Sequence, residues 1–328
     1  MSHSTFTRQR PAMILAACVA VGTVLIRGHA FWLDNAIAVG IFGLMALSVG
    51  LAYGQAGILS MATAAFASVG AFGSAIITTR YGLSPWWGLV PALLIPPLLA
   101  YPLARAVTRL SPLPLSIATL LLSGLFEIAI REGGDFTGGY IGLSGIPPLL
   151  DGAQPMFLLV WTAVLVAIVL YANLMGSTVG RAINTARHDP LRATADGVDV
   201  PHLLAGTFAV SASIAGVAGW LYAHHMSYVG PDSLTTQVSI SVLLMAVVGG
   251  AGTLLGPLLG TAVLMLLTLY LPAAESHGMV YGAILLAVLL LAPGGILGTR
   301  WRQRVRRPPA PGASGDAASR SHAPGAAR

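Results

Sequence analysis

Charged residues are scarce in this chain: only 9% of its 328 residues are Asp, Glu, Lys or Arg, whereas 55% are hydrophobic. Lysine is absent altogether, so all 17 basic residues are arginine. That absence excludes a phosphate-loop lysine, a Schiff-base lysine and a lysine general base. Cys18 is the only cysteine, which excludes an intramolecular disulfide and a metal site built from cysteines.

The chain also lacks the residue patterns of an intramembrane hydrolase. We find no paired aspartates, no Ser-His or Ser-Lys pair and no His-Glu-x-x-His motif,. His224 and His225 are adjacent, so on a helix they diverge and do not share one metal ion. We therefore expect no enzymatic activity, no metal site and no cofactor of the chain's own.

So apolar a composition indicates an all-α polytopic membrane protein rather than a soluble domain. Ten apolar runs predict about ten transmembrane helices. In order, they cover residues 11–26, 35–53, 61–79, 85–104, 114–130, 157–174, 203–223, 238–248, 258–271 and 279–291. The transmembrane domain then extends over residues 11–299, between a cytoplasmic N-terminus (1–10) and a basic cytoplasmic tail (300–328). We expect that tail to be disordered. The first run also fits a cleavable signal peptide, because small residues at 28–30 follow it.

The arginines set the orientation. With ten spans and both ends inside, 14 arginines lie on the cytoplasmic side and only Arg27, Arg80 and Arg131 lie outside. Cytoplasmic loops are enriched in arginine and lysine, so this orientation is favoured. It puts the polar loop 131–154 outside and the loop 176–202 inside.

The loop 176–202 is a polar island between two apolar runs. Asp189 followed by Pro190 is typical of a helix start, and Gly197 of a left-handed helix end. We expect a short helix over 191–195 that a soluble motor subunit grips. Leu191 and Ala195 would form an apolar knob, and Arg187 and Arg192 would orient it. The candidate coupling residues are Arg181, Arg187, Asp189, Pro190, Leu191, Arg192, Ala195 and Gly197. The alternative is a basic loop that only fixes topology.

Glycine-rich breaks interrupt the chain at 54–57 and at 249–252. Such breaks in two halves of a transporter often mark a path through the helix bundle. The span 61–79 is rich in alanine, glycine and serine, so we expect it to be central rather than lipid-facing. Glu127 is the one carboxylate well inside a predicted span. It forms either a local ion pair with Arg131, one turn away, or part of a pathway. The candidate pathway residues are Gln55, Gly57, Ser60, Ala64, Glu127, Gly249, Gly250 and Gly252.

Several of these motifs, taken in order, resemble the LivM family of permeases in branched-chain amino acid ABC importers. The segments that carry the resemblance are 54–60 with Ala64-Ala65-Phe66, Phe126-Glu127-Ile128 with Arg131, 137–139, 142–147, 180–197, 221–224 with Tyr228, 231–233, 249–253 and Gly256-Pro257. They cover residues 35–298. The chain departs from the family pattern at Pro190 and Arg192 in the island, and at Tyr140-Ile141 in the outer loop.

The resemblance implies a type II ABC importer permease fold in the bacterial inner membrane. It implies as partners two ATP-binding subunits, a second LivH-like permease and a periplasmic substrate-binding protein, with ATP held by the partner subunits. The cargo would be branched-chain or other hydrophobic amino acids. Two alternatives stay open: a related permease for urea, short amides or another small carboxylate, and a stand-alone secondary transporter or channel.

Overall fold

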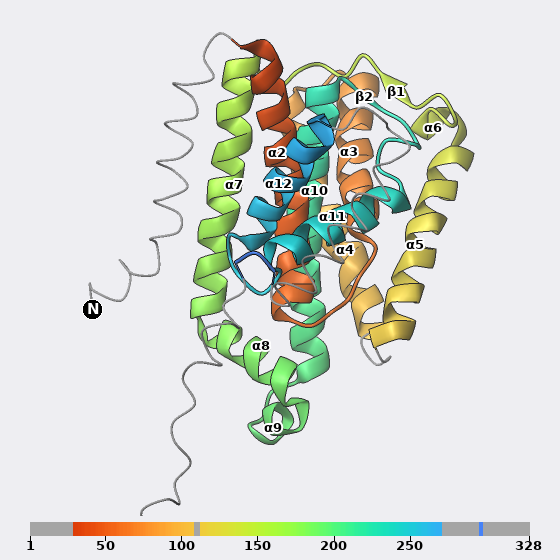
Figure 1. The fold of residues 1–328 in the computed structure, drawn as a ribbon. Coiled ribbons are helices and arrows are strands. Elements are labelled where there is room, and N and C mark those ends of the chain that lie inside the picture. Colours follow the sequence, from red (N-terminus) through yellow and green to blue (C-terminus); the bar gives the residue numbers. More distant parts are fainter. Residues whose placement is uncertain (1–28, 108–111, 271–294, 298–328) are drawn as a thin grey trace, which may run out of the picture. The chain divides into compact units, whose positions relative to one another are not determined.

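The computed structural model describes residues 29–107, 112–270 and 295–297. The predicted first and tenth spans, the N-terminus 1–10 and the tail 300–328 lie outside these ranges. The described part is a bundle of helices with one two-stranded sheet at an end of the bundle (Figure 1).

Six helices make up most of the bundle: α2 (Ala30–Val49), α3 (Thr63–Arg80), α4 (Leu89–Val107), α5 (Pro112–Glu132), α7 (Ala153–Gly176) and α10 (Val200–Met226). The shorter ones are α6 (Gly134–Thr137), α8 (Thr178–His188), α9 (Pro190–Ala195), α11 (Thr236–Gly249) and α12 (Gly256–Tyr270). A π-helix, η1 (Gly50–Gln55), continues α2, and a 3-10 turn, η2 (Pro85–Gly88), precedes α4. Strand β1 (Leu143–Ser144) pairs antiparallel with β2 (Tyr228–Val229).

Five stretches in the described residues are long and apolar enough to cross a membrane: Ala30–Gln55, Pro85–Ala106, Pro114–Glu132, Ala153–Gly176 and Val200–Met226. They correspond to the predicted second, fourth, fifth, sixth and seventh spans. The predicted eighth and ninth spans form α11 and α12, of only 14 and 15 residues. At a rise of about 1.5 Å per residue these helices are about 21–23 Å long, shorter than a hydrocarbon core of about 30 Å. The described residues thus form a multi-pass helical membrane protein, whereas the count of ten stays a prediction.

Helix α3 lies in the centre of the bundle, as its small residues predicted. It packs against α4 and α10, and most of its residues are buried. Glycines allow this closeness: a Cβ on Gly70 would collide with the Gly216 backbone, and one on Gly219 with the carbonyl oxygen of Ala67. Because lipid is as apolar as the side chains, such close packing is what holds membrane helices together.

The sheet closes the end of the bundle opposite α8 and α9 (Figure 1). Strand β1 belongs to the loop 131–154, which the arginine count puts outside, and β2 to the loop 227–235 between α10 and α11. Arg131, at the end of α5, bonds to Glu127 and to Asp232, each at 2.8 Å. The outer loops are therefore tied to each other and to α5.

We predict that Gly216→Ala destabilises the bundle, because its Cβ would collide with the Ala92 carbonyl oxygen of α4. Overpacking of this kind costs about 1–3 kcal/mol. Gly206→Ala on the same helix is the control, since its Cβ would meet nothing within 4 Å. Thermal unfolding of the detergent-purified proteins measures the difference, and equal midpoints would contradict the packing described for α10.

Candidate functional site

The two glycine breaks, far apart in the sequence, meet in the fold. A Cβ on Gly54 would collide with the carbonyl oxygen of Ala251, and one on Gly50 would come within 2.7 Å of Pro257 Cγ. The Gln55 side chain completes the contact, since its Nε2 donates to the Gly252 carbonyl oxygen at 3.1 Å. We call this contact of residues 50–57 with residues 249–257 the glycine crossing.

After the π-helix the chain runs without helical structure from Gly57 to Ala62. Exposed irregular backbone is not tolerated in a membrane, so its polar groups need partners from the protein. Met61 receives two: its N–H donates to Thr119 Oγ1 at 3.0 Å, and its carbonyl accepts from Ser123 Oγ at 2.9 Å. Both hydroxyls belong to α5, which therefore fixes this segment.

Side chains also hold the segment where it enters α3. The Ser60 hydroxyl accepts from the Ala62 N–H at 3.2 Å, and Ser239 Oγ on α11 accepts from the Ala64 N–H at 2.9 Å. The start of α3 is thus bonded to the same helix that ends in the second glycine break. Ser239 lies near the start of α11, about 15 Å along that helix from Gly249,.

The second break is a tight turn between α11 and α12. Gly250 has φ of +108°, a conformation that favours glycine,. Thr253 Oγ1 donates to the Gly250 carbonyl at 2.9 Å and accepts from the Gly256 N–H at 3.1 Å. A Cβ on Gly260 would collide with the Met245 carbonyl, so the two short helices lie in close contact. The predicted eighth and ninth spans therefore form one helical hairpin.

The polar island forms two helices, of which the sequence predicted one. Helix α9 has the expected ends: Asp189 Oδ1 accepts from the Arg192 N–H at 3.0 Å, Pro190 is its first residue, and Gly197 after it has φ of +82°. Helix α8 was missed. Its signal was Ser177, whose hydroxyl accepts from the Gly180 N–H, followed by the buried Ile183 and Ala186 one helical turn apart,.

Helix α9 presents its apolar knob outward. Leu191 is 84% exposed and Ala195 is exposed beside it, whereas Ala193 is buried. Arg181 and Arg192 are exposed as well. Figure 1 shows α8 and α9 at the end of the bundle away from the sheet.

Arg187, a coupling candidate, faces Gly57, a pathway candidate. A Cβ built on Gly57 would lie 3.6 Å from Arg187 Cγ, so a side chain at position 57 would meet the stem of this arginine. Gly57 has φ of +75°, which any residue with a side chain adopts only at a cost. The coupling and pathway candidates, predicted separately, are thus neighbours at these two residues.

Glu127 lies apart from the other pathway candidates. It pairs with Arg131 at 2.8 Å, which is the local ion pair that the sequence allowed. Along α5 it is about 12 Å from Thr119, the residue that contacts Met61. The structure gathers Gln55, Gly57, Gly249, Gly250 and Gly252 around the crossing, whereas Ser60 and Ala64 lie where the chain enters α3, beside the start of α11.

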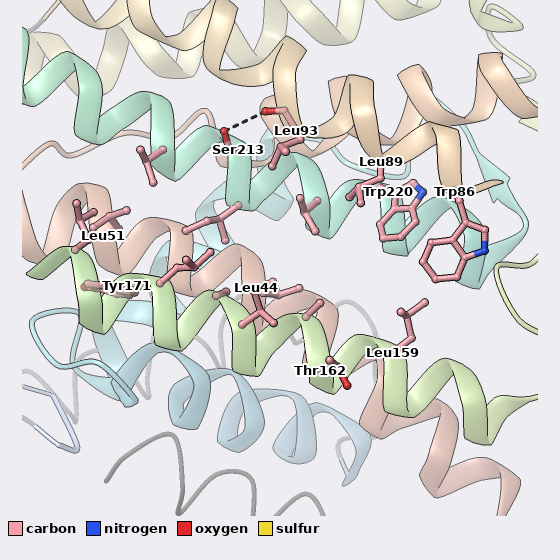
Figure 2. A pocket seen from close by; sticks show the side chains of 18 residues that line it. Leu44, Leu51, Trp86, Leu89, Leu93, Leu159, Thr162, Tyr171, Ser213 and Trp220 are labelled. Atoms are coloured by element: carbon pink, nitrogen blue, oxygen red, sulfur yellow. Dashed lines mark hydrogen bonds between the residues drawn. The ribbon is translucent and has the colours of Figure 1, made fainter. Parts of the chain in front are cut away.

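An apolar groove of about 560 Å³ runs beside the crossing. Side chains of α2, η1, η2, α4, α7 and α10 line it, from Trp86 and Trp220 at one end to Leu51 and Tyr171 at the other (Figure 2). None of its described lining residues is charged. The groove therefore offers no counter-charge to a carboxylate or an amino acid zwitterion.

Comparison with known proteins decides the family. The model of the branched-chain amino acid transport system permease component matches residues 32–290. The chain belongs to this permease family. It is 26% identical over 314 residues to the LivM permease proteins of Salmonella typhimurium and of Escherichia coli, covering 87% of this chain and 73% of each relative. It is 25% identical over 286 residues to a probable LivH of Methanocaldococcus jannaschii, covering 80% of this chain and 90% of that relative. No solved structure matches the chain.

The matched range of this permease contains all of the helices α3 to α12 and all of α2 except its first two residues. Sequence reasoning found its glycine breaks and the short helix of the polar island but missed the residues that hold the segment after the first break. Those are Thr119 and Ser123 on α5 and Ser239 on α11. Their only sequence signal is a polar atom in an apolar run, which is common in membrane helices.

We predict that Gly54→Ala in this permease abolishes transport, because its Cβ would push the Ala251 carbonyl away and open the crossing. Gly252→Ala is the matched control within the same contact, since its Cβ would meet nothing within 4 Å. Substrate uptake, normalised to the amount of inserted protein, measures both. Wild-type uptake by Gly54→Ala would show that the close approach is not needed for transport.

Proposed function

We propose that this permease is the membrane-spanning subunit of an ATP-binding-cassette importer in the bacterial inner membrane. It works with two ATP-binding subunits, a second LivH-like permease and a periplasmic substrate-binding protein. The partner subunits bind and hydrolyse ATP, and this chain moves the cargo. The similarity to LivM and LivH permease proteins supports this proposal.

The observation that carries the proposal is the exposed, capped helix α9. A loop that only fixed topology would need its arginines but not a helix with both ends built and a leucine 84% exposed at its start,. An exposed apolar side chain surrounded by charges is what a protein contact uses: the apolar group supplies affinity, and the charges supply orientation. The apolar group here is Leu191; Arg192 follows it in the chain, and Asp189 and Asp196 flank the two ends of the helix.

Helix α9 is also placed to pass on motion. Asp199 caps α10 by accepting from the His202 N–H at 3.1 Å, and α8 follows α7 after Ser177 alone. A force on α9 therefore reaches α10 directly and α7 through α8.

For the cargo we propose branched-chain or other hydrophobic amino acids, as the relatives' names indicate. Urea, short amides and other small carboxylates are the competing substrates within this class. In such systems the binding protein selects the ligand, so calorimetry of the cognate binding protein against these compounds decides between them.

We predict that Leu191→Glu leaves the permease inserted but uncouples it from the ATP-binding subunits. Burying an unpaired carboxylate at the contact costs at least about 1–3 kcal/mol, which lowers affinity about 5- to 150-fold. Co-purification with the ATP-binding subunits and substrate-stimulated ATP hydrolysis measure this loss. Ile141→Glu is the control, because Ile141 is 82% exposed but lies in the loop before β1, at the other end. If the Leu191→Glu variant binds the ATP-binding subunits and transports as the wild type does, the loop 176–202 serves only as a topology signal.

We further predict that these two positions face opposite sides of the membrane. Ile141→Cys and Leu191→Cys are made separately in a Cys18→Ala background and treated with an impermeant thiol reagent in intact cells. The cysteine at position 141 should be labelled, and the one at position 191 only after the cells are permeabilised. The reverse pattern would overturn both the orientation and the docking of ATP-binding subunits on α9.

A further inference from the structure

A small cavity lies at the end of the bundle that carries the sheet, between the start of α2, the start of α7 and the end of α10 (Figure 1). Its volume is about 200 Å³. Ile37 and Met156, which are 0% and 5% exposed, give it an apolar wall. The Asp34 carboxylate and the His225 ring also line it. The cavity therefore combines an apolar wall with polar side chains, and it is separate from the glycine crossing and from α9.

The polar side chains of this cavity present hydrogen-bond acceptors. His225 Nε2 lies 3.3 Å from Asp34 Oδ1, so in the neutral ring the proton is on Nε2 and Nδ1 is left as an acceptor. The His225 side chain is only 9% exposed, and no hydrogen bond from the described residues reaches its Nδ1. The described lining contains no arginine. A buried acceptor without a donor is unfavourable, so the cavity suits a ligand that donates hydrogen bonds and carries positive charge.

His224, the neighbour of His225, holds the wall of the cavity in place. Its Nδ1 donates to the Pro147 carbonyl at 2.7 Å, and its Nε2 lies 2.7 Å from Ser74 Oγ. Because a carbonyl only accepts, the proton is on Nδ1, and Nε2 of the neutral ring accepts from the Ser74 hydroxyl. Both ring nitrogens are thus occupied. The loop that contributes Pro148 to the cavity is therefore bonded to α10 and, through Ser74, to α3.

The start of α7 adds hydrogen-bond donors to the cavity. Gly152 and Ala153 line it at this end of the 24-residue helix. No side chain caps the helix there, and Pro155, its third residue, has no N–H. The N–H groups of the first two residues lie at the positive end of the helix dipole, where a carboxylate is stabilised. A ligand with both an ammonium and a carboxylate group can therefore pair with two sides of the cavity.

We propose that this cavity is an outer binding site of the permease for hydrophobic amino acids. The ammonium group pairs with Asp34 and donates to Nδ1 of His225, the apolar side chain lies against Ile37 and Met156, and the carboxylate accepts from the start of α7. Urea has no charge to pair with Asp34, and a simple carboxylate is repelled by it. The site thus narrows the proposed cargo to compounds with an ammonium group. Its role as a stage of import rests on the proposed function, whereas binding at the cavity does not.

The first test measures binding to the permease alone, as the full chain in lipid nanodiscs without binding protein or ATP-binding subunits. Calorimetry with leucine should show binding. Isopentylamine, which is leucine without its carboxylate, should compete with it. Isocaproate, which is leucine without its ammonium group, and urea should not compete. Absence of leucine binding, or competition by isocaproate as strong as that by isopentylamine, overturns the proposal.

The second test is Asp34→Asn, which keeps the shape of the side chain and removes its charge. The Asp34 side chain is 70% exposed, so its contribution lies between that of an exposed ion pair and that of a charged hydrogen bond. The affinity for leucine should then fall about 5- to 12-fold. Asp135→Asn is the control, because this exposed carboxylate lies on α6, outside the cavity. Equal losses in the two variants would show a general effect of charge and no site at Asp34.

The third test fills the cavity by Ala153→Trp. Ala153 is exposed in the first turn of α7, so the substitution should leave the fold intact while leucine binding is lost. Gln154→Trp is the matched control, since Gln154 is exposed as well but does not line the cavity. Because neither residue is buried, this comparison decides even where Asp34→Asn is poorly expressed. Unchanged leucine binding by Ala153→Trp would place the ligand elsewhere and overturn the proposal.

The outer site and the proposed function are separable by experiment. If the assembled transporter imports leucine but the permease alone does not bind it, the outer site falls and the proposed function stands. If the permease binds leucine at this cavity but associates with no ATP-binding subunit, the proposed function falls and the outer site stands.

Discussion

The structure depends on one constraint, that backbone polar groups inside a membrane must find partners within the protein. Helices meet it by themselves, but residues 57–62 are not helical. Their partners come from elsewhere in the chain: the hydroxyls of Thr119 and Ser123 on α5 bond to Met61, and Ser239 on α11 bonds to Ala64. The non-helical segment before α3 is therefore held in place by hydrogen bonds to α5 and α11.

Small residues make two kinds of close contact in this bundle. On α3 and α10 they let whole helices approach, as at Gly70 and Gly216, and so build the core. At the crossing Gly54 lets a π-helix touch the carbonyl of a turn, and there the contact is local. The first kind stabilises the fold over many residues. The second concentrates one close approach and one side-chain hydrogen bond at a single place.

The exposed helix pair lies next to that place. Helix α9 has a side-chain cap at its start, and α8 joins it to α7. Arg187 on α8 faces Gly57, at the end of the crossing. Its predicted role in orienting a docking knob stays a prediction.

The sequence by itself determined the class, five of the spans, the central place of α3 and the start and end of α9. Each of these rests on local chemistry: apolar length, small-residue content, or a capping pair such as Asp189 and Pro190. It also named most residues of the crossing, but as two unrelated breaks. Only the tertiary structure decided that Gly54 meets Ala251, that Gln55 bonds to Gly252, that Glu127 pairs away from the crossing, and that α11 and α12 form a short hairpin. These contacts join residues up to about 200 positions apart in the sequence. Packing between helices determines which of these residues meet. No periodicity or motif within one segment encodes which other segment it will touch.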